Sequence, residues 1–129
     1  MTRYLISFTD GAMDHIPDED MPAVAKAAHA VAEEALNAGV YLFAGGLEFQ
    51  RPSVVAPDGT VTDGPYPQTR DLSGGFAIVD VPTREAALEW AAKIAVACRC
   101  PQEVREFGDD PELEAMLRQM DSRPRPAQT

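Results

Sequence analysis

The hydrophobic positions of this chain change their period several times, and these changes predict strands that alternate with helices. Residues 4–8 form a short apolar, β-prone run, and residues 9–11 close it with the composition of a turn. Further along, apolar residues recur at the spacing of an amphipathic helix, for which we expect Asp20 to be the N-cap, Pro22 to lie in the first turn and Gly39 to be the stop. The predicted apolar stripe of this helix consists of Val24, Ala28, Val31 and Ala35.

The middle of the chain has the periods of strands. Residues 40–47 are almost continuously apolar, which predicts a central strand that is either buried on both faces or leads into a site. Residues 54–56 and 60–62 flank the Pro-Asp-Gly sequence of residues 57–59, and this pattern predicts a β-hairpin inserted as an arm. Residues 75–81 are again apolar and β-prone and predict the next strand.

A second helix, an edge strand and a third helix are expected in the remainder of the chain. Thr83 has the composition of an N-cap, and Pro101 excludes further continuation of the helix that follows it. Residues 103–107 alternate like a final edge strand, so we expect one domain at 1–107 and a C-terminal helix with a flexible tail at 108–129. The predicted apolar face of the second helix consists of Ala87, Ala91, Ile94 and Cys98, and that of the third of Leu113, Met116, Leu117 and Met120.

The order of these elements predicts an α+β fold. It fits a ferredoxin-like βαββαβ sandwich with an inserted β-hairpin, in which two helices cover one face of an antiparallel sheet. The other face of such a sheet needs a cover as well. Apolar residues on both faces of residues 40–47 and 76–81 therefore predict that two sheets pack together in a homodimer.

Composition narrows the class of protein. The 129 residues form a single domain by length, and 45% hydrophobic and 25% charged residues are ordinary values for a folded chain. The formal net charge of −10 disfavours nucleic-acid binding, because it repels phosphate backbones. No stretch has the roughly 20 apolar residues of a membrane span, and the start has no basic, apolar leader, so we expect a cytoplasmic protein.

Neither a metal nor a cofactor is expected. The two cysteines, Cys98 and Cys100, have no neighbouring Cys or His cluster that would complete a zinc site, so we interpret them as free thiols. The glycine pairs at 45–46 and 74–75 lack the downstream helix and lysine of a phosphate-binding loop. The aromatic side chains form no stacking pattern with basic residues, and core packing is the better explanation of them.

Residues 62–76 concentrate turn-forming, charged and aromatic residues between two apolar runs. Gly64 and Pro65 restrict the backbone shape, and Gly74 and Gly75 allow another backbone or a ligand to approach closely. Such a composition indicates a role beyond packing.

A set of short motifs occurs in order along the chain: Tyr4-Leu5-Ile6, Glu33-Glu34, Gly39-Val40, Gly46-Leu47, Thr62-Asp63-Gly64-Pro65-Tyr66, Gly74-Gly75-Phe76, Ala87-Leu88-Glu89-Trp90-Ala91 and Glu103-Val104-Arg105. By these motifs the chain resembles the DGPF family, also called the YCII-related domain family. The resemblance extends over most of the chain, and its family fold, a dimeric α+β barrel, agrees with the fold expected from the residues. Two departures occur: the usual Phe after Asp-Gly-Pro is Tyr66, and one usual carboxylate is Gln68.

Asp63 and His29 are the candidate catalytic residues. Asp63 follows a strand and precedes a rigid Gly-Pro turn, where it either acts as an acid or base at a pocket rim or shapes the loop as an Asx-turn. His29 lies roughly 130° from the apolar stripe of its helix, so it faces solvent or reaches around the helix edge. His15 is expected at the surface. A His–Asp pair is implied by the resemblance, because some family members resemble dehydrochlorinating or lactone-processing enzymes.

Four further residues are candidates for ligand binding. Arg70 either clamps an anionic group or ties down its own loop, and Tyr66 offers a ring and a hydroxyl group. Gly74 and Gly75 complete this set. Two functions follow. One is a homodimer that binds a small organic ligand and performs cofactor-free proton transfer or elimination. The other is a non-enzymatic regulatory module with a protein partner, since the resemblance includes members associated with extracytoplasmic-function sigma factors.

Overall fold

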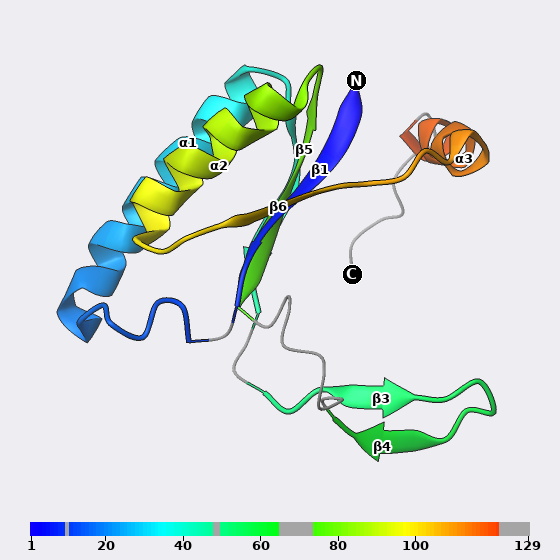
Figure 1. The fold of residues 1–129 in the computed structure, drawn as a ribbon, viewed down its shortest axis with the longest axis horizontal. Helices are drawn as coiled ribbons and strands as arrows, with labels where there is room; N and C mark the ends of the chain where they lie inside the picture. The colour runs from blue at the N-terminus through cyan, green and yellow to red at the C-terminus, as the bar shows by residue number, and fades with distance from the viewer. Residues whose placement is uncertain (10, 48–49, 65–73, 122–129) are drawn as a thin grey trace, which may run out of the picture.

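The computed structural model describes residues 1–9, 11–47, 50–64 and 74–121 (Figure 1). Within these ranges the elements follow the predicted alternation of strands and helices. In chain order they are β1 (Thr2–Phe8), the 3-10 helix η1 (Asp18–Asp20), α1 (Met21–Asn37), β2 (Tyr41–Gly46), β3 (Ser53–Val55), β4 (Val61–Asp63), β5 (Gly75–Val81), α2 (Arg84–Cys98), β6 (Glu103–Glu106) and α3 (Pro111–Asp121).

The main sheet has four antiparallel strands in the order β2-β5-β1-β6. Without the β3–β4 hairpin and α3, the chain has the βαββαβ order and the strand arrangement of a ferredoxin-like sandwich, so the predicted fold class is confirmed. Helices α1 and α2 lie side by side on one face of the sheet, and α3 lies on the opposite side (Figure 1). We call these the helix-covered face and the open face.

The predicted central position of residues 40–47 is wrong. Strand β2 is an edge strand, and β5 and β1 occupy the centre of the sheet. The register shifts between Tyr41 and Phe43, and the side chains of Leu42 and Phe43 are 44% and 56% exposed. A continuous apolar run cannot by itself distinguish a central strand from an edge strand whose surface is apolar. The predicted edge position of β6 is confirmed.

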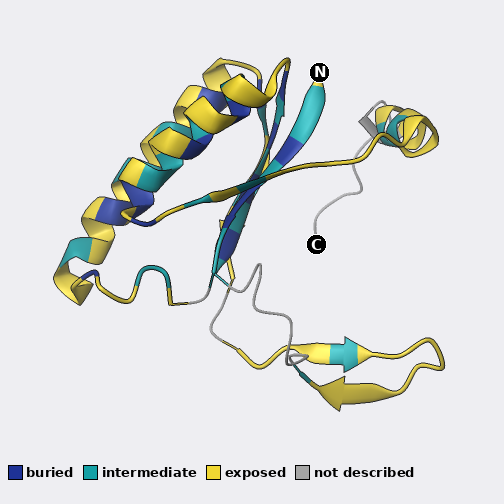
Figure 2. Ribbon diagram, viewed as in Figure 1, coloured by how far each residue is buried: buried dark blue, intermediate teal, exposed yellow. Residues whose placement is uncertain are grey.

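The core lies between the helix-covered face and the two helices (Figure 2). Buried and half-buried residues alternate along β5, as they must when only one face of a strand meets the core. Tyr4 and Ile6 of β1 lie on the same face, and the Tyr4 hydroxyl donates a hydrogen bond to Glu106 Oε1 at 3.1 Å. The helices contribute the predicted apolar stripes, with Val24, Ala35, Ala87, Ala91 and Cys98 buried and Ala28, Val31 and Ile94 half-buried.

The helix ends follow the predicted signals with one difference. Asp20 precedes α1, but its side chain makes no capping hydrogen bond; its Oδ2 instead accepts one from Arg99 Nη1 at 3.0 Å. Gly39 has a φ of +74°, in the left-handed region that follows many helix ends. Thr83 caps α2 as predicted, because its Oγ1 accepts the Ala86 N–H at 3.1 Å.

The predicted hairpin arm is present as a separate two-stranded sheet that projects from the sandwich (Figure 1). At its turn Asp58 Oδ1 accepts the Thr60 N–H at 2.9 Å, and Gly59 has a φ of +89°. The third helix is also present as α3, with Leu113 and Met116 exposed, whereas the predicted tail lies outside the described residues. No helix in the described ranges is both long and apolar enough to cross a membrane.

Candidate functional site

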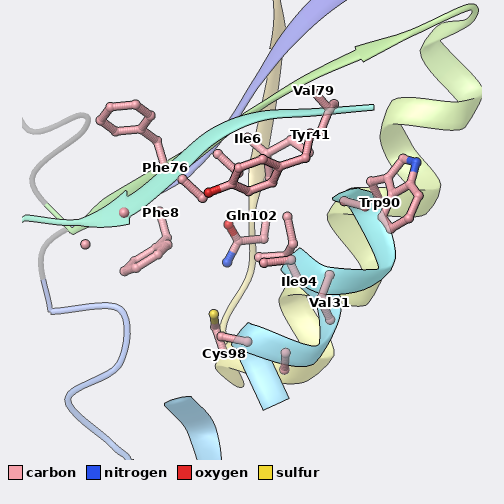
Figure 3. A pocket seen from close by; sticks show the side chains of 18 of the residues that line it. Ile6, Phe8, Val31, Tyr41, Phe76, Val79, Trp90, Ile94, Cys98 and Gln102 are labelled. Carbon is pink, nitrogen blue, oxygen red and sulfur yellow. The ribbon is translucent and has the colours of Figure 1, made fainter. Parts of the chain in front are cut away.

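A cavity of about 410 Å³ lies between the helix-covered face and helices α1 and α2 (Figure 3). Its volume has a local cause in the sequence. Ala28, Ala32 and Ala35 of α1 and Ala97 of α2 line it, and such small side chains do not fill the space between helix and sheet. Most of the other lining groups are apolar, among them Ile6, Phe8, Val31, Val79 and Ile94.

A few polar groups reach the cavity. Tyr41 of β2 and Gln102, which precedes β6, both project into it (Figure 3). The Tyr41 hydroxyl makes no hydrogen bond to any described residue. The Gln102 amide donates from Nε2 to the carbonyl oxygen of Cys100 over a long 3.4 Å. Both side chains therefore retain hydrogen-bonding capacity toward a molecule in the cavity.

The thiol of Cys98 also lines the cavity. Burial raises the pKa of Cys98, and the neighbouring Cys100 thiol raises it further. Gln102 contacts the second of these thiols, because its Nε2 donates to Cys100 Sγ at 3.4 Å. Cys98 and Cys100 are free thiols, as the sequence predicted. Cys98 therefore presents a neutral S–H group to the cavity near neutral pH.

Trp90 and Phe8 lie at opposite ends of the cavity (Figure 3). The Lys93 ammonium group lies 5.2 Å from the centre of the Trp90 ring, a cation–π distance. The Lys93 ammonium group also donates a hydrogen bond to Glu34, which links α2 to α1. These contacts hold the two helices together at this boundary of the cavity.

Two glycine pairs face each other where β2 and β5 meet near Phe8. Gly46 pairs with Gly75, and the Leu47 N–H donates to the Gly74 carbonyl at 2.8 Å. A Cβ atom on Gly75 would lie 2.9 Å from the Gly45 carbonyl oxygen and 2.9 Å from Phe8 Cζ. The close approach predicted for Gly74 and Gly75 is therefore made by neighbouring backbone and an aromatic ring. Because Gly45 and Gly46 line the cavity, the chain enters β5 beside one end of it.

Asp63 lies at the end of β4 on the hairpin arm. Its side chain is 79% exposed, and its Oδ2 lies 3.9 Å from Arg51 Nη1. An exposed ion pair of this kind contributes at most about 1 kcal/mol. The arm is well separated from α1 in Figure 1, and Asp63 is not among the described residues that line the cavity.

His29 is exposed on α1 and also contributes to the cavity lining. It therefore satisfies both alternatives that the helix geometry left open, since it faces solvent and reaches the cavity at the helix edge. His15 is exposed, as expected. Tyr66 and Arg70, the other candidate ligand-binding side chains, lie outside the described residues.

The sequence interpretation missed Tyr41 and Gln102 as cavity residues. Tyr41 belongs to an apolar run and was assigned to core packing, although a tyrosine at such a position brings a polar group to a buried face. Gln102 stands between Pro101 and a strand, where no sequence pattern distinguishes it from a surface residue. Among the described side chains, no group of three or more His, Cys, Asp or Glu residues is arranged to hold a metal ion.

The model of the YCII-related domain family matches residues 3–107. This match spans the whole sandwich and the arm, so the chain belongs to the YCII-related domain family, as the sequence motifs indicated. A comparison with curated proteins gives no match.

Proposed function

We propose that this protein is a homodimer that binds a small organic molecule in the cavity between the sheet and helices α1 and α2, beside the Asp-Gly-Pro loop. The cavity itself carries this proposal. A volume of about 410 Å³ with a mostly apolar lining and a few polar groups is typical of small-molecule sites. The proposed compartment is the cytoplasm, where thiols such as Cys98 and Cys100 stay reduced.

The open face of the sheet supports the homodimer. It carries Leu5, Phe43 and Ile78 in register with one another, and the Phe43 side chain is 56% exposed. Antiparallel sheets can leave one face to water, but that face is then polar. An apolar open face instead favours burial against a second copy of the same face.

A polar group on the same face also favours a cover. Asp80 of β5 stands opposite Arg3 of β1 in the strand register. Its Oδ1 is buried without a hydrogen-bond partner among the described residues. A buried carboxylate oxygen of this kind is costly unless a donor reaches it. A second subunit packed on this face would bring such donors close.

For catalysis we propose cofactor-free proton transfer or elimination. His29 lines the cavity and carries a side chain suited to proton transfer near neutral pH. Asp63 would need to reach the cavity from the arm of the other subunit, because the arm of its own chain points away. In this proposal Tyr66, Arg70, Gly74 and Gly75 contact the ligand from the Asp-Gly-Pro side.

Binding of the neutral naphthalene dye Prodan tests the proposed ligand site. Ala28→Phe places a ring in the cavity, whereas Ala30→Phe adds the same ring to an exposed position of the same helix. We expect the native protein and Ala30→Phe to bind the dye with a blue-shifted emission, and Ala28→Phe to lose at least about tenfold in affinity, because the ring competes for the cavity. Equal binding by both variants would contradict a ligand site in this cavity.

The arm gives one observation in favour of a non-enzymatic interaction module. Val55 and Val61 on the arm are 64% and 62% exposed, and the net charge of −10 suits a basic protein partner. In this alternative Val55→Asp abolishes a stoichiometric complex with that partner and leaves Prodan binding unchanged. A complex that instead depends on Ala28, and not on Val55, would favour the ligand-binding function.

A further inference from the structure

We propose that the natural ligand of the cavity is a neutral, flat, ring-containing molecule with one hydroxyl or carbonyl group that bonds to Tyr41 and Gln102. This inference rests on the proposed ligand-binding function and adds to it the chemical class of the ligand.

The shape and lining of the cavity favour a ring. Its volume of about 410 Å³ holds a molecule of one or two fused rings with space to spare. Three of its walls are themselves rings, those of Phe8, Tyr41 and Trp90 (Figure 3). Aromatic walls stack or meet edge to face with a flat apolar ligand, and such pairs add to the free energy gained from burial.

The charges around the cavity disfavour an ionic ligand. Among the described residues that line it there is no Asp, Glu, Lys or Arg, and Cys98 is protonated near neutral pH. The other ionisable side chain among these described lining residues that lies on a helix is His29, and it is exposed to solvent. A carboxylate or ammonium group placed between the sheet and the helices would lose its hydration without gaining a charged partner.

The polar groups on the cavity wall specify a neutral hydrogen-bonding group instead. The Tyr41 hydroxyl has no partner among the described residues, and the Gln102 amide has only a long hydrogen bond of 3.4 Å and a contact with Cys100 Sγ. A hydroxyl and an amide each donate and accept, so together they suit a ligand hydroxyl or carbonyl. An apolar ligand without such a group would leave both side chains unpaired and would bind less tightly.

Equilibrium dialysis with three matched naphthalenes tests this inference. The probes are naphthalene, which has no polar group, β-naphthol, which is neutral at pH 7, and β-naphthoate, which is an anion. Each is measured with the native protein, with Tyr41→Phe, and with the control Tyr4→Phe. The control removes a hydroxyl group from the same face of the sheet, at a residue whose hydroxyl bonds to Glu106 and does not line the cavity.

We expect β-naphthol to bind about threefold to tenfold tighter than naphthalene and at least about tenfold tighter than β-naphthoate. Tyr41→Phe should remove most of the advantage of β-naphthol without weakening naphthalene binding, and Tyr4→Phe should change neither. The same order of affinities for the three probes in a His29→Gln variant would show that the imidazole group does not determine this order.

Tighter binding of β-naphthoate than of β-naphthol would overturn the inference and leave the ligand-binding function standing. Equal losses for naphthalene and β-naphthol in Tyr41→Phe would also overturn it, because the hydroxyl would then act through packing. If none of the three probes binds, the ligand-binding function fails together with the inference.

Discussion

The two faces of the four-stranded sheet both carry large apolar side chains but differ in their cover. On the helix-covered face Tyr4, Ile6 and Val79 are only 3%, 1% and 2% exposed. On the open face Leu5 and Ile78 are half-buried, although they are equally apolar and occupy neighbouring positions of the same strands. The alternation of side chains along a strand therefore defines two faces, while the packing of other elements decides which face becomes the core of a single chain.

The cavity lies on the helix-covered face, between the sheet and helices α1 and α2. Ala28, Ala32 and Ala35 of helix α1 face the sheet across the cavity, and their small side chains leave the space between the two layers unfilled. The open face, in contrast, offers large apolar side chains such as Phe43 without a cover in the chain itself. One face is thus suited to a ligand and the other to a second subunit.

The largest expected effect is a difference in the free energy of unfolding between substitutions on the two faces. Ile6→Ala should lower the free energy of unfolding by about 2–5 kcal/mol, because Ile6 is 1% exposed and its truncation removes buried apolar surface and enlarges the cavity that it lines. Leu5→Ala, one residue away on the open face, should cost clearly less in the monomer. Urea unfolding at low protein concentration measures both. Equal losses would mean that the open face is as well packed as the covered face within one chain.

The next effect concerns the proposed dimer. Phe43→Glu should convert a dimer to monomers at micromolar concentration, because it would bury a carboxylate without a partner, at a cost of several kcal/mol. Val96→Glu is the matched control, since Val96 is 80% exposed on the outer surface of α2. Sedimentation velocity distinguishes the two. A native protein that sediments as a folded monomer would contradict the dimer outright.

A smaller effect is expected where the neighbouring strands β2 and β5 approach each other most closely. Gly75→Ala should destabilise the fold by about 1–3 kcal/mol, since its Cβ would meet a backbone oxygen at 2.9 Å and the strands must move apart. Gly108→Ala is the control, because a Cβ there meets nothing within 4 Å. Thermal unfolding of the two variants gives the comparison, and an unchanged midpoint for Gly75→Ala would show that β2 shifts freely at the sheet edge.

The smallest effect is confined to the arm, which belongs to neither face. The backbone N–H of Thr60 bonds to the Asp58 carboxylate and holds the pKa of Asp58 below its usual range. Because the folded-state pKa is lowered, this bond stabilises the turn above the unfolded-state pKa of about 4 and is lost as pH falls through the folded-state value.

An NMR titration measures this effect. The Thr60 amide shift should follow the Asp58 titration, with a midpoint below that of an ordinary aspartate, while the amides of the sandwich stay unchanged. A Thr60 amide that is insensitive to pH in this range would rule out the hydrogen bond in solution.

Local signals along the chain were sufficient for the elements and for the family. Thr83 at the start of α2 and Gly59 in the arm turn stand where helix capping and turn geometry require them. The motifs from Tyr4 to Arg105 identified the YCII-related domain family, and a family match over residues 3–107 confirms it. The cap and the turn depend on residues that are close in sequence, which is why the sequence alone could reveal them, whereas the family was revealed by motifs in a fixed order along the chain.

The candidate site was harder to predict because its parts come from distant segments. Asp63 lies at a strand end and His29 at the edge of a helix. Asp63, however, is on the arm, whereas His29 lies beside the cavity. Tyr41 and Gln102 lie far apart in the chain and share a cavity only because β2 and the entry to β6 border the same layer. No local pattern encodes that proximity.

The sequence was sufficient to predict the order of strands and helices, the Thr83 cap and the arm turn, because these follow from periodicity and from contacts a few residues apart. The family followed from the resemblance of motifs that occur in order along the chain. Only the tertiary structure decided that β2 is an edge strand, that the apolar run of residues 40–47 is left partly uncovered, and that alanine-rich helices leave a cavity against the sheet. The physical reason is that strand order and unfilled volume depend on how whole layers pack, which the hydrophobicity of a single segment does not specify.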